Sequence, residues 1–123
     1  GHTFCQPGTN GAAARYEAHE MKLDESKVTV TEDFFDKDAY IFENSGCREV
    51  SIQADGKVAV TVTFDAPVFG LWSPVGKKVP FICIEPWYGR ADAADFDGNL
   101  QKRAWQNELE PGKIFEKAYT IAF

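Results

Sequence analysis

The chain has 123 residues, enough for one domain, and a formal net charge of −6. This acidic charge argues against nucleic-acid binding, because proteins that bind phosphates normally present a basic face. The sequence holds no apolar run near the ~18 residues of a membrane-spanning helix and no signal peptide. We therefore expect neither a nucleic acid nor a membrane as a partner.

The predicted elements, in chain order, are almost all β-strands separated by Gly, Pro and Asp turns. They cover residues 16–23, 27–31, 39–43, 49–53, 57–65, 68–72, 81–85 and 114–123. An Asp-Gly pair at positions 55–56 predicts a hairpin. Short helical turns are expected at 32–35 and 99–107. This pattern predicts an all-β fold, a sandwich or a barrel, in one domain over residues 1–123.

Three cysteines, Cys5, Cys47 and Cys83, cannot all pair, and their spacing matches no zinc pattern. Cys83 lies in an apolar run and is expected to act as a small hydrophobic residue. The two histidines, His2 and His19, do not form a ligand-spaced pair, so we expect no metal. The free thiols favour a cytoplasmic location.

The most informative segment is residues 80–92. Phe81 to Ile84 form an apolar run that predicts a strand buried on both faces, ended by Pro86, which cannot continue a central ladder. The strand delivers Glu85 beside Trp87 and Tyr88. An acid next to flat amphipathic rings suits a sugar, because the carboxylate can exchange protons and the rings can stack on the sugar.

This segment, CIEPWYG followed by Asp92, resembles the strand that carries the catalytic glutamate in the aldose 1-epimerase (galactose mutarotase-like) family, and most of all its LacX-like bacterial branch. Residues 33–42, 69–74 and 109–123 resemble three further family segments in the same order. The resemblance implies an antiparallel β-sandwich and a cofactor-free hexose mutarotase that interconverts α and β anomers. Family members are more than twice as long, which implies that the chain is the C-terminal portion of such a protein and a partial domain.

The resemblance implies two catalytic residues. Glu85 matches the catalytic glutamate and is the expected base; the alternative is a strand-end carboxylate paired with Arg90 or with a backbone amide. Residues 1–7, GHTFCQP, are similar to the stretch that carries the catalytic histidine, so His2 is the expected acid that protonates the ring oxygen. Alternatively, Gly1-His2 is a cloning remnant.

Four further residues are expected to bind the substrate. The resemblance implies that Asp38 accepts hydrogen bonds from sugar hydroxyls; the alternative is a turn or cap aspartate. Trp72, Trp87 and Tyr88 are candidate aromatic surfaces for the sugar, although a tryptophan in a sandwich is more often part of the core. Asp92 is expected to brace the loop that follows.

Two other functions stay open at this stage. The first is a non-catalytic carbohydrate-binding sandwich, and the second is a structural or regulatory module on the same fold. The resemblance also implies that an N-terminal half brings another histidine and an arginine to the site. We therefore expect the chain to associate with another copy or with that missing half.

Overall fold

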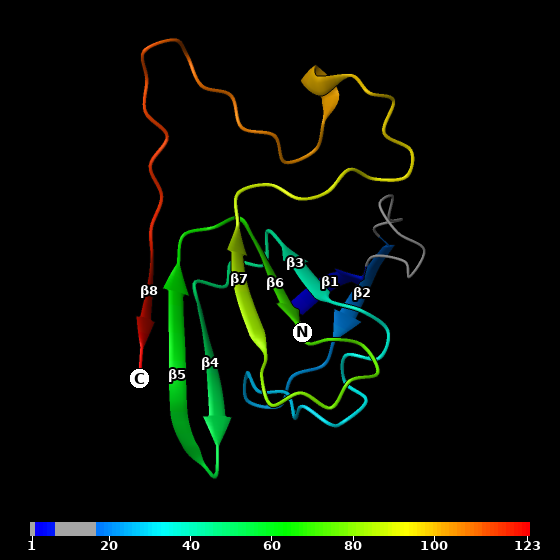
Figure 1. Cartoon of the computed structure of the whole chain (residues 1–123), viewed down its shortest axis with the longest axis vertical. Coiled ribbons are helices and arrows are strands. Elements are labelled where there is room, and N and C mark those ends of the chain that lie inside the picture. Colours follow the sequence, from blue (N-terminus) through cyan, green and yellow to red (C-terminus); the bar gives the residue numbers. More distant parts are fainter. Residues whose placement is uncertain (1, 7–16) are drawn as a thin grey trace.

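The computed structural model describes residues 2–6 and 17–123 of the chain, and the side chains of residues 18–123. The described part is nearly all β and forms two antiparallel sheets (Figure 1). The order in the first sheet is β2-β1-β3-β6-β7, and in the second β4-β5-β8. The elements are β1 (His2–Gln6), β2 (Glu17–Met21), β3 (Tyr40–Glu43), β4 (Glu49–Ala54), β5 (Lys57–Phe64), β6 (Val68–Trp72), β7 (Cys83–Trp87), the 3₁₀ helix η1 (Leu100–Lys102) and β8 (Tyr119–Ala122).

Aromatic side chains between the two sheets form the centre of the core. Phe42 of β3 and Phe69 of β6 are direct cross-strand neighbours, and their rings stack with centroids 4.6 Å apart. Phe64 of β5 in the second sheet approaches Phe69 at 5.3 Å, and Val62 lies in the same buried cluster. Burying one such side chain stabilises the fold by roughly 1.5–3 kcal/mol. This packing confirms the predicted antiparallel β-sandwich and fixes the position of β6.

The Asp-Gly pair forms the predicted hairpin between β4 and β5. Asp55 has a φ of 50° and Gly56 a φ of 75°, as a tight turn with two left-handed residues requires. The pairing register shifts between Ile52 and Gln53, which is an irregularity of the β-bulge type. Val62 and Phe64, further along β5, are both buried.

Other predicted elements form only in part. Residues 28–31 form no strand, and Val28 and Val30 remain exposed, because no described strand lies alongside to pair with them. The predicted C-terminal strand is shortened to β8, and the predicted helical turn at 99–107 is reduced to η1. At 32–35 the backbone forms turns, with the Phe34 N–H donating to the Thr31 carbonyl at 3.1 Å. The strand β1 was not predicted.

The strand that carries Glu85 differs most from its prediction. We expected it to be doubly buried and to end at Pro86, but β7 runs from Cys83 to Trp87, and Pro86 pairs with Phe69 of β6. All five of its residues are half-buried. Because β7 is an edge strand of the described sheet, one side of it needs no ladder hydrogen bonds, and the missing N–H of proline is tolerated there.

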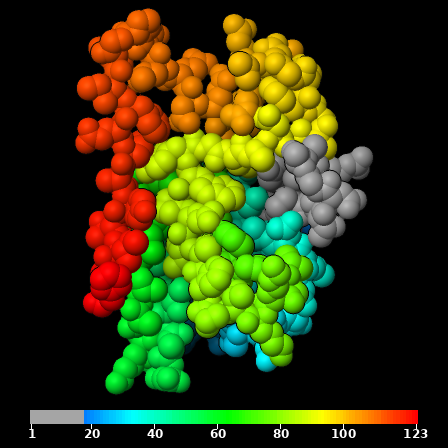
Figure 2. Space-filling model, viewed as in Figure 1, coloured from blue at the N-terminus to red at the C-terminus, as the bar shows by residue number. Residues whose placement is uncertain are grey.

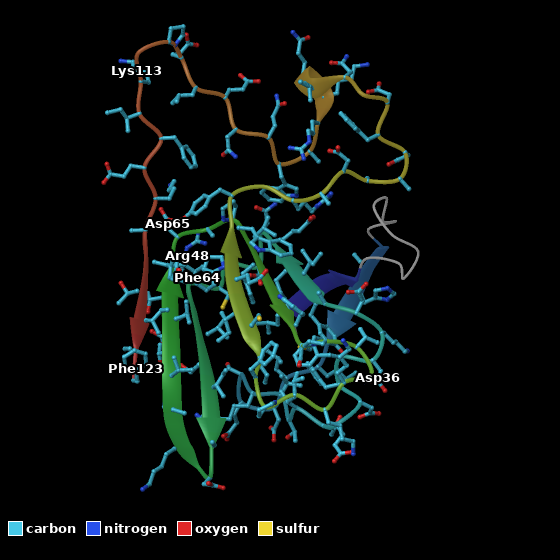
Figure 3. All side chains as sticks on the ribbon, viewed as in Figure 1. Asp36, Arg48, Phe64, Asp65, Lys113 and Phe123 are labelled. Carbon is cyan, nitrogen blue, oxygen red and sulfur yellow. The ribbon has the colours of Figure 1, made fainter. Side chains whose placement is uncertain are left out.

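The end of β7 is tied to the second sheet through Tyr88. Its hydroxyl donates to Asp65, which follows β5, and its ring meets Phe115 edge to face at 5.9 Å. Lys117 lies 5.0 Å from the ring centre and forms an ion pair of 3.1 Å with Asp65. Figure 3 places Asp65 where β5 ends, beside the segment that descends to β8, and Figure 2 shows that segment along the side of β5. These contacts join three segments that are distant in the sequence.

Ionisation of Tyr88 is predicted to weaken the fold at alkaline pH. Burial, and then the hydrogen bond to Asp65, raise the pKa of Tyr88 to about 12. Because this value lies above the ordinary 10.0, the stabilisation is complete below about pH 10 and is lost as the pH rises through about 12. We expect Tyr88→Phe to flatten the fall of the unfolding free energy across this range, measured by chemical denaturation. Tyr119→Phe, at an exposed position, is the control, and an unchanged slope in Tyr88→Phe would contradict the prediction.

Candidate functional site

The face of β6 and β7 that points away from the core gathers the candidate residues. In the register of these strands Gly70 lies opposite Glu85, and Trp72 lies opposite Cys83. Because side chains alternate along a strand, Glu85 and Trp87 lie on one face of β7 and Ile84 lies on the other. Ile84 instead packs against the core cluster. The neighbouring strands β6 and β7 therefore present Trp72, Glu85 and Trp87 together, each half-buried.

Both oxygens of the Glu85 carboxylate accept a hydrogen bond from a tryptophan. The Trp72 Nε1–H donates to Oε1 at 2.7 Å, and the Trp87 Nε1–H donates to Oε2 at 3.1 Å. Hydrogen bonds to an ionised group are stronger than those between neutral groups. Three of the predicted site residues thus form one hydrogen-bonded group. The predicted alternative, a pair of Glu85 with Arg90, is replaced by these bonds, and Arg90 forms an ion pair with Glu43.

Gly70 is a site residue that the sequence analysis missed. A Cβ atom at this position would lie 2.9 Å from Cζ2 of the Trp87 ring, closer than real contacts allow. The absence of a side chain therefore lets the Trp87 indole lie across β6 and reach Glu85. The sequence did contain a signal for this contact, because a glycine inside a strand often marks a position that another group approaches closely.

The thiol of Cys83 lies on the same strand face as Glu85. Burial raises the pKa of Cys83, and the negative charge of Glu85 raises it further. Cys83 therefore stays protonated and uncharged beside the acid at neutral pH, in keeping with its expected role as a small hydrophobic residue.

Asp38 has an unusual backbone conformation, close to the start of β3. Its φ is 115°, which side chains rarely adopt, and its own Oδ1 accepts the Ala39 N–H at 2.7 Å. Tyr40 pairs with Leu71, so Asp38 lies at the end of the sheet where Trp72 also lies. Strained residues persist where the surrounding structure holds them, and they occur frequently at functional sites. The structure gives Asp38 both a local turn contact and a position near the site end of the sheet.

Tyr88 is not part of the hydrogen-bonded group around Glu85. Tyr88 makes its hydrogen bond with Asp65 and its ring contact with Phe115, so its described contacts are those of a tie to the second sheet. The backbone of His2 is in β1, where it pairs with Met21. The side chain of His2 lies outside the described residues.

The loop after β7 lines a small, open cavity of about 250 Å³. Its lining comes from residues between Arg90 and Ala104, so it is separate from the group around Glu85. Asp92 accepts a hydrogen bond of 2.5 Å from Arg103 Nε, which is the bracing contact expected of it. Among residues 18–123 no cluster of His, Cys, Asp and Glu could hold a metal ion. No helix in the described part of the chain is long and apolar enough to cross a membrane.

A comparison with solved structures finds a protein with a similar fold. The chain is similar to a solved structure described as a galactose mutarotase related enzyme from Lactobacillus acidophilus, with 32% sequence identity and a TM-score of 0.80. The match covers 98% of this chain and 40% of that protein, so the chain spans about two fifths of its length. No family model matches the chain, and no curated protein matches it.

An alanine at position 70 is predicted to displace Trp87. The added methyl group would collide with the ring at 2.9 Å, so the ring must move and its bond to Glu85 must lengthen. We expect Gly70→Ala to lower the unfolding free energy by about 1–3 kcal/mol, measured by urea denaturation. The matched control is the same change in a Trp87→Ala background, where the cost should disappear. An equal cost in both backgrounds would contradict the proposed contact.

Proposed function

We propose that this chain, which belongs to the galactose mutarotase-like family, is part of a hexose mutarotase (aldose 1-epimerase). The observation that carries the proposal is the Glu85 carboxylate, held by two tryptophan N–H groups on a half-buried sheet face. Such a carboxylate is oriented but still accessible, as a general base must be. The likeness to a galactose mutarotase related enzyme gives independent support.

The reaction needs one base and one acid on either side of the C1–O5 bond of the sugar. Glu85 takes the proton of the anomeric hydroxyl while the acid protonates the ring oxygen, and the C1–O5 bond breaks to give the open-chain aldehyde. Rotation about C1–C2 turns the other face of the aldehyde towards the oxygen, and the reverse proton transfers close the ring. The starting protonation states are restored, and the steps use only acid and base groups.

The other predicted residues have roles in the same proposal. His2 is the acid in this mechanism, on the motif similarity of residues 1–7 alone. Asp38 accepts hydrogen bonds from the sugar hydroxyls, supported by its strained backbone at the site end of the sheet. The sugar is an aldohexose, and the location of the protein is the cytoplasm.

Replacing Glu85 tests this function. In the full-length protein, Glu85→Gln keeps the shape of the side chain but removes the base, so we expect kcat for anomer interconversion to fall by at least about a hundredfold while sugar binding remains. Polarimetry on freshly dissolved α-glucose and α-galactose measures the rate, and calorimetry measures binding. Glu110→Gln, at an exposed position in the C-terminal segment, is the control. A wild-type protein that binds sugars without accelerating mutarotation would instead indicate a carbohydrate-binding sandwich.

We also propose that the chain associates with a second copy or with the N-terminal half of the protein. Apolar side chains are exposed on β8 and just before it: Ile114 is 85%, Tyr119 60% and Ile121 48% exposed. Such a surface favours contact with another protein segment. We expect a light-scattering mass for the isolated chain above 13.7 kDa. A mass equal to one chain would exclude self-association.

A further inference from the structure

The two tryptophans beside Glu85 have their N–H edges directed at the carboxylate. Trp72 approaches one oxygen from the end of the neighbouring strand β6, and Trp87 approaches the other from two residues further along β7. A carboxylate held at both oxygens from two different strand positions can no longer rotate freely. The sequence pattern predicted that these rings are flat surfaces for a sugar, whereas the observed contacts with Glu85 are made by the Nε1–H group at the edge of each ring.

We propose that Trp72 and Trp87 are positioning residues, whose indole N–H groups hold the Glu85 carboxylate in one orientation for proton transfer. This rests on the proposed function in one respect, namely that Glu85 is the base. An indole N–H can only donate a hydrogen bond, so neither tryptophan competes for the proton that Glu85 receives. An ionised carboxylate has about four acceptor positions, and the indoles occupy two of them. The remaining positions are available to the anomeric hydroxyl.

The surroundings of both rings make these donors rigid. The Trp72 ring meets Phe81 edge to face, with centroids 6.5 Å apart. The Trp87 ring lies directly over Gly70, the residue that pairs with Glu85. Donors fixed in this way need no reorganisation when charge changes on the acid, which is the condition for electrostatic preorganisation. Cys83 leaves the arrangement undisturbed, because the high pKa of its thiol keeps it uncharged.

The test removes each N–H while keeping an aromatic ring. In the full-length protein, we expect Trp72→Phe and Trp87→Phe each to lower kcat roughly tenfold, with KM within about threefold of wild type. The pH–rate profile is recorded for each variant as well, because a change in the hydrogen bonds of the Glu85 carboxylate should alter that profile. The matched control is Trp105→Phe, the third tryptophan of the chain, which should change neither quantity.

A different pattern of kinetics would overturn the proposal. If Trp72→Phe and Trp87→Phe raise KM but leave kcat and the pH profile unchanged, the tryptophans are contact surfaces for the sugar and do not position Glu85. A merely structural role predicts loss of folded protein with no movement of the pH profile in the fraction that remains folded, and this result also counts against positioning.

A second measurement does not depend on activity. Nuclear magnetic resonance of ¹⁵N-labelled protein gives one indole N–H signal for each of the three tryptophans. As the pH falls, the signals of Trp72 and Trp87 should move together in one protonation step that is absent from Glu85→Gln, while the Trp105 signal stays fixed. If the step in the two signals disappears in Glu85→Gln but the protein interconverts no sugar, the positioning role is supported and the proposed reaction is rejected. If the protein interconverts sugars but the step is unchanged in Glu85→Gln, the positioning role is rejected and the proposed reaction stands.

Discussion

The candidate site depends on two hydrogen bonds, which the indole N–H groups of Trp72 and Trp87 donate to the Glu85 carboxylate. A carboxylate on a half-buried sheet face loses part of its hydration and needs hydrogen-bond donors in its place. Trp72 and Trp87 reach it only because β6 and β7 lie in one register, with Gly70 opposite Glu85. The stacked rings of Phe42 and Phe69 in turn hold β6 against its other neighbour, β3.

The position of β7 at the edge of the described sheet explains two features together. An edge strand tolerates Pro86 within its length, so the strand continues to Trp87 and places its ring on the same face as Glu85. An edge strand also buries its residues less than a central one, which leaves the acid half-exposed. Access to solvent and a fixed orientation are both required of a base that exchanges protons with a ligand.

Much of the fold could be predicted from the sequence, and the reasons for the failures are physical. Period-2 alternation found the strands at 40–43, 49–54 and 57–64, and an Asp-Gly pair found the hairpin. The same alternation failed at 27–31, because a strand needs a partner that local pattern does not supply. At the site, Glu85, Trp72 and Trp87 were identified one by one. Their hydrogen bonds could not be, because these depend on cross-strand register and on the gap at Gly70.

The neighbouring aromatics Trp87 and Tyr88 have different roles although they are adjacent in the sequence. Trp87 is the last residue of β7, and Tyr88 follows it outside the strand. Trp87 donates to Glu85, while Tyr88 donates to Asp65 and thereby connects the end of β7 to the second sheet. An edge strand lacks a second neighbour to restrain it. The Trp72 bond to Glu85 from β6 and the Tyr88 bond to Asp65 supply the restraint that a base of fixed orientation requires.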